Sequence, residues 1–273
     1  MFSSLRAKIN IRYFMVVYTA ALLAFAAFGT HHPARFLNGL GIVAVYSLAD
    51  LLWNRAVSGR WSVPVSSFIS GFILAIVALP VPGLAVIVIL PLIAATTKHL
   101  LHFGRSRHVF NPAASALAVV CLFMPAVSWW GASWGNPAII VVAAIGAFIL
   151  WRQQRWHTAL AFFAIFLPLS CLAALLGGGL PSSLPGLLQI LVFDGVTIFF
   201  ASVMLIEPVT SYFPTRRQRT VYGALVGLFA AAASFALSRL ANTNLDPLLV
   251  GLLLGNLTAS LLFLPKAEKR API

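Results

Sequence analysis

WRQQRWHTALAFFAIFLPLSCLAALL, residues 151–176, joins two arginines to a run of 21 residues without Asp, Glu, Lys or Arg. A helix of this length crosses the roughly 30 Å of hydrocarbon in a bilayer, because each residue adds about 1.5 Å. Nine further apolar runs lie at 13–30, 36–53, 66–80, 82–97, 110–124, 137–151, 186–206, 220–238 and 245–264. We therefore predict an all-α integral membrane protein with about ten transmembrane helices.

The basic residues occupy alternate connections between these runs. Of the 18 Lys and Arg residues, all but Arg35 and Arg239 fall on one side of this topology. They are Arg6, Lys8, Arg12, Arg55, Arg60, Lys98, Arg105, Arg107, Arg152, Arg155, Arg216, Arg217, Arg219, Lys266, Lys269 and Arg270. Basic residues collect in cytoplasmic loops. The pattern predicts a protein of the cell (inner) membrane with both termini in the cytoplasm.

The composition excludes an ordinary soluble domain. Hydrophobic residues make up 61% of the chain and charged residues 8%, whereas charged residues reach about 25% in soluble domains. The net charge of +13 lies in alternate loops, which argues against nucleic-acid binding and suits anionic lipid headgroups. We expect the lipid bilayer as a partner and no nucleic acid.

No metal site is expected. Cys121 and Cys171 lie about 50 residues apart, without a Cys-x-x-Cys motif that would hold a cluster or zinc. His99 and His102 share a helix face if the fourth apolar run continues that far. Contacts with lipid headgroups at the membrane surface explain the histidines better than haem does.

The chain divides into two halves, 1–130 and 131–273, each with five apolar runs. Weak features recur in the same order: a Gly-containing apolar run that ends at a proline, a basic cluster, and then Asn111-Pro112 or Asp246-Pro247. Because five is odd, a repeat of this kind is inverted in the membrane, with its site between interrupted helices near the midplane. We expect these interruptions in the third and eighth runs.

Acidic residues are scarce, and four of the five allow a specific interpretation. Asp194 either caps the second part of an interrupted helix or contacts a flavin, an ion or a substrate. Glu207 either pairs with the nearby arginines at the membrane surface or belongs to a site. Asp246 is expected to cap the tenth helix, and Asp50 to pair with Arg55.

Several motifs together resemble one family. Ser70-Gly71-Phe72-Ile73-Leu74-Ala75, then Lys98, then Phe110-Asn111-Pro112-Ala113 occur in that order. Glu207-Pro208-Val209-Thr210-Ser211 and Leu254-Gly255-Asn256-Leu257-Thr258 follow. This series resembles the NqrB/RnfD family, whose members are membrane components of the sodium-translocating NADH:quinone reductase and of the Rnf electron transport complex. The family fold, two inverted five-helix halves, agrees with the division above.

The resemblance implies a flavin held among the helices, close to Phe110 and Asn111. Asn111 would hydrogen-bond the flavin, or it would cap the helix that starts at Pro112, and the two roles are compatible. Carried over in this way, the candidate binding residues are Ser70, Gly71, Lys98, Phe110, Asn111, Asp194, Thr197, Glu207 and Thr210. No catalytic residue is assigned.

The chain also departs from the family. Members attach a second flavin, FMN, to a threonine of a Ser-x-x-Thr pattern, and no threonine of this chain has Ser three residues before it. The loop that carries that threonine in the Rnf pattern is reduced here to Pro125–Pro137. We therefore expect a short member without covalent FMN, binding riboflavin or FMN noncovalently.

The resemblance thus predicts a membrane subunit of a flavin-dependent electron transport complex, coupled to Na⁺ or H⁺ movement. Such a chain would act as a non-autonomous subunit of an oxidoreductase. Its partners would be other membrane subunits or a cytoplasmic flavoprotein reductase, and a quinone. The alternative is a solute channel, transporter or membrane anchor that kept the fold and lost the cofactors.

Overall fold

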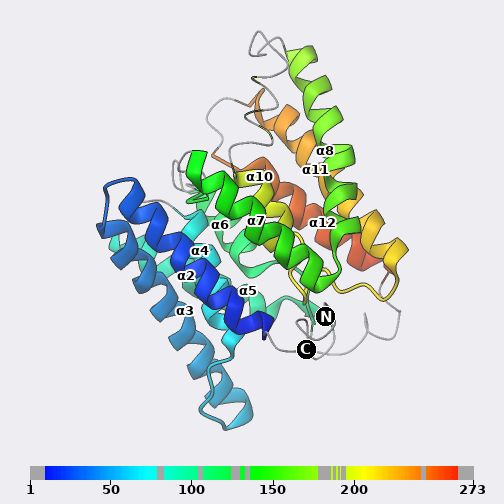
Figure 1. The fold of residues 1–273 in the computed structure, drawn as a ribbon. Coiled ribbons are helices and arrows are strands. Elements are labelled where there is room, and N and C mark those ends of the chain that lie inside the picture. The colour runs from blue at the N-terminus through cyan, green and yellow to red at the C-terminus, as the bar shows by residue number, and fades with distance from the viewer. Residues whose placement is uncertain are drawn as a thin grey trace, which may run out of the picture.

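The computed structural model describes residues 10–78, 83–103, 107–123, 130–132, 136–177, 186, 189, 191, 195–240 and 244–263. Figure 1 shows helices throughout, with one two-residue antiparallel ladder between β1 (His102–Phe103) and β2 (Arg107–His108). The helices are α2 (Ile11–Gly29), α3 (Ala34–Ser58), α4 (Val65–Val77), α5 (Leu84–Leu100), α6 (Pro112–Cys121), α7 (Asn136–Gln153), α8 (Trp156–Gly177), α10 (Val196–Phe199), the π-helical turn η1 (Phe200–Met204), α11 (Arg216–Leu237) and α12 (Pro247–Phe263).

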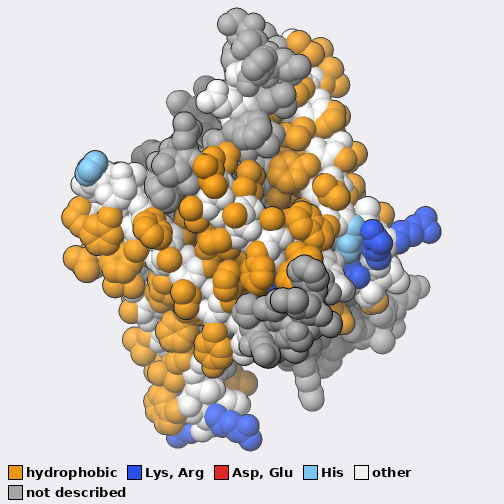
Figure 2. Space-filling model, viewed as in Figure 1, with side chains coloured by type: hydrophobic (Ala, Val, Ile, Leu, Met, Phe, Trp, Pro, Cys, Tyr) orange, Lys and Arg blue, Asp and Glu red, His pale blue; other side chains and the backbone are white. Residues whose placement is uncertain are grey.

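The long apolar helices make this a membrane protein. Four helices are long and apolar enough to cross a bilayer: α2, α3, α8 and α11. Five shorter apolar helices accompany them in the described part of the chain. Hydrophobic side chains cover much of the face seen in Figure 2, while Lys and Arg lie at its edges. Helices occur at the predicted apolar runs, and the number of crossings stays a prediction.

The eighth apolar run is interrupted, as expected, whereas the third forms one short helix that is continuous from Val65 to Val77. Helix α4 has 13 residues and stops at Ala78, which is extended. Its length of about 20 Å is too short to cross a bilayer. In the eighth run the helix α10 begins only after Gly195, whose φ of +88° lies in the left-handed region.

The end of α4 and the residue before α10 both approach the same short segment, 130–132. The backbone N–H of Gly131 donates to the carbonyl of Ile76 at 2.8 Å, near the end of α4. A Cβ added to Gly195 would lie 2.4 Å from the carbonyl oxygen of Ala132. Position 195 therefore requires glycine for two reasons: its backbone conformation and its close approach to Ala132.

Helices α8, α11 and α12 approach one another closely at glycines. A Cβ at Gly223 of α11 would lie 2.2 Å from the Thr158 carbonyl oxygen on α8, and α8 and α11 run side by side in Figure 1. Gly251 of α12 approaches the backbone of Ala230 on α11 in the same way. Glycines of this kind let helix backbones touch, which drives helix packing where lipid offers no hydrophobic gain.

The other half packs around α4, and α6 links the two halves. Helix α4 contacts α2, α3 and α6, while α5 packs on α3 and α6. Helix α6 also contacts α12. The fold therefore holds the fifth and tenth apolar runs against each other.

These two linking helices begin in the same way. The side-chain oxygen of Asn111 accepts from the Ala114 N–H at 3.0 Å, one residue before α6 starts. Asp246 accepts from the Leu248 N–H at 2.9 Å at the start of α12. The predicted capping roles of both residues are confirmed, and each is followed by proline at the first helical position.

The Asp246 cap gives a first prediction. Asp246 also accepts a hydrogen bond from the Trp130 indole N–H, so Asp246→Ala removes this bond together with the helix cap. We expect a loss of about 1–2 kcal/mol in the free energy of unfolding, measured by denaturation in detergent. The control is Asn244→Ala, at an exposed position just before the cap. Equal stability of the two variants would contradict the prediction.

Candidate functional site

A cavity of about 300 Å³ lies where α2, α4 and the start of α6 approach the segment after η1. Aliphatic side chains such as Ile69, Ile73 and Val203 form much of its wall. Its polar lining residues are Arg12, Ser66, Ser70, Asn111, Gln153 and Glu207. A mainly apolar wall with a few polar groups is typical of small-molecule sites, and the volume lies at the lower end of their range.

Asn111 and Glu207 form the polar centre of this cavity. The Asn111 side-chain N–H₂ donates to Glu207 Oε2 at 3.0 Å, and the Thr210 hydroxyl donates to the same oxygen at 2.9 Å. His108 Nε2 lies 3.4 Å from the other carboxylate oxygen. Because the Asn111 oxygen is held by the α6 cap, its amide has a fixed orientation, with N–H toward Glu207. These partners replace the predicted surface pairing of Glu207 with arginines.

A second polar cluster surrounds Asp50, which is fully buried on α3. Its carboxylate accepts from the Ser67 hydroxyl and the Lys98 ammonium, and His99 Nε2 lies 2.6 Å from Oδ1. The predicted pairing of Asp50 with Arg55 is wrong, since Arg55 donates to the Gly59 carbonyl. Asp50 points into the bundle, whereas Arg55 lies at the exposed end of the helix.

The histidines are also arranged differently from the prediction. Helix α5 ends at Leu100, so His102 belongs to β1 and does not share a helix face with His99. The His99 ring stacks on Trp53 with centroids 4.8 Å apart. His99 and His108 thus contact different carboxylates, Asp50 and Glu207. The described histidines near the site contact protein carboxylates, where headgroup contacts were expected.

Tyr46 lies between the two polar clusters. It is fully buried on α3, and its hydroxyl has no hydrogen-bond partner among the described residues. The hydroxyl is close to Ser70 and interacts electrostatically with both Asp50 and Glu207. The Lys98 ammonium lies 5.5 Å from the centre of the Tyr46 ring. Tyr46 therefore lies between the Asp50 cluster and the cavity, within electrostatic range of both carboxylates.

The structure does not bring all nine candidate residues from the sequence into one site. Ser70, Asn111 and Glu207 line one cavity, and Thr210 bonds to it through Glu207. Lys98 belongs to the Asp50 cluster.

Of the remaining four, Gly71, Phe110 and Thr197 are not among the residues that line that cavity. Phe110 is half-buried beside Asn111, and Gly71 faces Val43, whose Cα would lie 3.1 Å from an added Cβ. Thr197 is buried in α10, and Asp194 lies outside the described residues.

Sequence reasoning missed three participants. Arg12 lines the cavity, Asp50 is the centre of the second polar cluster, and Tyr46 lies between the two. Asp50 carried a detectable signal, because a carboxylate inside an apolar run needs a buried partner. Lys98 lies 48 residues further along the chain, and nothing local in the sequence links the two.

The part of the chain that the structure describes contains no group of three or more His, Cys, Asp or Glu side chains placed to hold a metal ion. No family model matches the sequence, and no curated protein matches it either. Function is therefore inferred from the cavity, its polar groups and the motif resemblance.

Proposed function

We propose that this protein is a membrane subunit of a flavin-dependent electron transport complex and binds one flavin noncovalently in the Asn111–Glu207 cavity. The supporting observation is that this single cavity collects Ser70, Asn111 and Glu207 from separate motifs of the resemblance. These residues come from distant parts of the sequence, and hydropathy alone gives no reason for them to meet.

The cavity suits a flat, partly polar ring. Aliphatic walls accommodate the apolar faces, and the second N–H of Asn111 is free to donate to a ring carbonyl or nitrogen. Arg12 places a positive charge at the cavity wall, where it would favour a ligand that becomes more negative. A bound flavin would accept electrons and pass them on, while the protein orients it and keeps out water.

The ionisable groups near the cavity support coupling of this reaction to proton or Na⁺ movement. Glu207 lines the cavity, Tyr46 lies within electrostatic range of both Glu207 and Asp50, and Asp50 pairs with Lys98 and His99. Ionisable groups inside membrane helices are costly and generally serve a pathway or a partner. In our proposal, Glu207 is the group that faces the cavity, and the Asp50–Lys98 pair is the fixed charge pair beside it.

The two linking helices support the inverted arrangement of two halves and ten crossings. Asn111 caps α6 and donates to Glu207, which belongs to the other half. Asp246 caps α12 and accepts from Trp130, in the connection between the halves. In this proposal the Arg12 end of the bundle faces the cytoplasm, as the loop charges indicate.

Visible absorbance of the purified protein tests the proposed function. We expect a flavin spectrum near one equivalent per chain, with the flavin released by acid because it is not covalently attached. A colourless protein that stays colourless after addition of riboflavin or FMN would overturn the proposal. The cofactor-free channel or membrane anchor would then be the better assignment.

Asn111→Ser tests the site itself. Serine caps helices about as well as asparagine, so α6 keeps its cap while the side-chain N–H₂ is lost. We expect flavin affinity to fall about ten-fold, the equivalent of one hydrogen bond to a polar or charged group. The measurement is flavin fluorescence titration, with the thermal unfolding midpoint as the fold control. Unchanged affinity would remove Asn111 from the site.

A further inference from the structure

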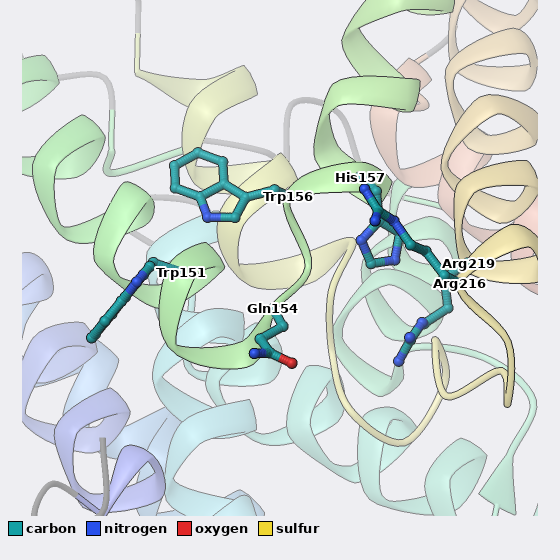
Figure 3. A pocket seen from close by; sticks show the side chains of 6 residues that line it. All are labelled: Trp151, Gln154, Trp156, His157, Arg216 and Arg219. Carbon is teal, nitrogen blue, oxygen red and sulfur yellow. The ribbon is translucent and has the colours of Figure 1, made fainter. Parts of the chain in front are cut away.

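A second cavity lies on the protein surface, where the α7–α8 connection meets the start of α11. Its volume is about 390 Å³, and its lining residues are Trp151, Gln154, Trp156, His157, Arg216 and Arg219. Figure 3 shows that His157, Arg216 and Arg219 lie together on one side, with Trp151 and Trp156 opposite. The proposed function does not use this cavity.

The cavity carries positive charge without a counter-ion among its lining residues. Arg216 and Arg219 line it, and none of the lining residues is acidic. Arg155, behind it, is only 5% exposed and donates to the Ser211 carbonyl at 3.0 Å. Burial and the neighbouring Arg219 lower the pKa of Arg155 to about 10, so it is still charged at neutral pH. The positive charges of Arg155, Arg216 and Arg219 repel one another, and a bound anion would offset this repulsion.

Unused hydrogen-bond donors mark the same place. The buried Nε of Arg219 and Nε2 of His157 have no hydrogen-bond partner within the described chain. Buried polar nitrogens of this kind are normally paired. Guanidinium groups bind phosphate oxygens through two parallel hydrogen bonds, so a phosphate in the cavity would balance the charge of Arg216 and Arg219 through their accessible N–H groups.

The surroundings of the cavity favour a lipid as the source of the phosphate. Trp156, at its wall, is 42% exposed, and Leu160, one helical turn further along α8, is 63% exposed. Tryptophan at this kind of boundary lies at headgroup depth, with acyl chains beside the next turn. Figure 2 shows Lys, Arg and His side chains next to hydrophobic surface at this edge. We propose that this cavity binds the phosphate headgroup of an anionic phospholipid.

The test compares lipids and variants on the full-length protein in mild detergent. The probes are dioleoyl phosphatidylglycerol, dioleoyl phosphatidylcholine and inorganic phosphate. The readouts are the thermal unfolding midpoint and the number of bound lipids seen by native mass spectrometry. The variant is Arg216→Gln/Arg219→Gln. Arg217→Gln is the matched control, because it removes the same kind of charge from the same helix turn at an exposed residue outside the cavity.

We expect phosphatidylglycerol to raise the unfolding midpoint of the wild type and of Arg217→Gln. The double variant should bind this lipid about ten-fold or more weakly, since two charge-assisted contacts are lost. Arg219→Lys, which keeps the charge, should retain more binding than the double variant. Unchanged size-exclusion profiles and circular dichroism show that the variants are folded without lipid.

Three results would overturn the inference. One is an equal loss of binding in Arg217→Gln, which would show that only the net charge matters. Another is equal stabilisation by phosphatidylcholine, which would remove the preference for an anionic lipid. The third is stabilisation by inorganic phosphate alone that the double variant abolishes, because the site would then take a soluble phosphate compound.

Discussion

Lys98→Met is expected to lower the free energy of unfolding by about 3–5 kcal/mol, the usual cost of leaving one partner of a buried ion pair uncompensated. Asp50 is fully buried, and Lys98 supplies the positive charge that contacts its carboxylate. Methionine keeps the length and the apolar part of the side chain, so the effect isolates the charge. Ser67 and His99 remain but add no permanent charge to balance the carboxylate.

The measurement is reversible unfolding of the detergent-solubilised protein, with two companion variants. Asp50→Asn/Lys98→Met removes both charges and should recover much of the lost stability, because replacing a whole buried pair is far less costly than breaking it. Arg55→Met, at an exposed position on the same helix as Asp50, should change stability by no more than about 0.5 kcal/mol. A double variant no more stable than Lys98→Met would show that the ion pair is not the cause.

Gly223→Ala is expected to lower the free energy of unfolding by about 2–3 kcal/mol. This is at the upper end of the cost of overpacking a protein interior. The new Cβ would lie 2.2 Å from the backbone carbonyl oxygen of Thr158. A backbone atom cannot turn aside as a side chain does, so α8 and α11 must separate. The loss should appear although alanine is favoured over glycine within helices by about 1 kcal/mol.

Gly41→Ala is the matched control for this variant. It lies within α3, and the nearest atom to its added Cβ is the Ile87 Cγ2 methyl at 3.0 Å, which can move. We expect this substitution to be neutral or to stabilise the protein by up to about 1 kcal/mol. If both variants unfold at the same denaturant concentration, close packing at Gly223 does not hold α8 and α11 together.

Features that depend on neighbours along the chain were predictable. The apolar runs located the helices, because a helix in lipid needs a continuous apolar stretch. The Asn111-Pro112 and Asp246-Pro247 pairs indicated the starts of α6 and α12, because a capping side chain acts within three residues of itself. The interruption in the eighth run followed from Gly195 near its middle.

Features that depend on three-dimensional packing were not predictable from the sequence. Asp50 was assigned to its sequence neighbour Arg55, although its partners lie on another helix. The contact of Gly223 with Thr158 depends on how α11 faces α8, which a run of apolar residues does not encode. Within the candidate site, Ser70, Asn111 and Glu207 were selected, whereas the contribution of Arg12 depends on the path of α2.

The pairing of Asn111 with Glu207, and of Asp246 with Trp130, also constrains how the chain can be divided. Each side chain that starts a linking helix has its second partner outside its own half. A fragment ending after α6 would expose an amide without its carboxylate acceptor, and one starting at α7 would lack the indole donor. Either fragment synthesised alone is therefore incomplete, because each half supplies a hydrogen-bond partner to the capping side chain of the other.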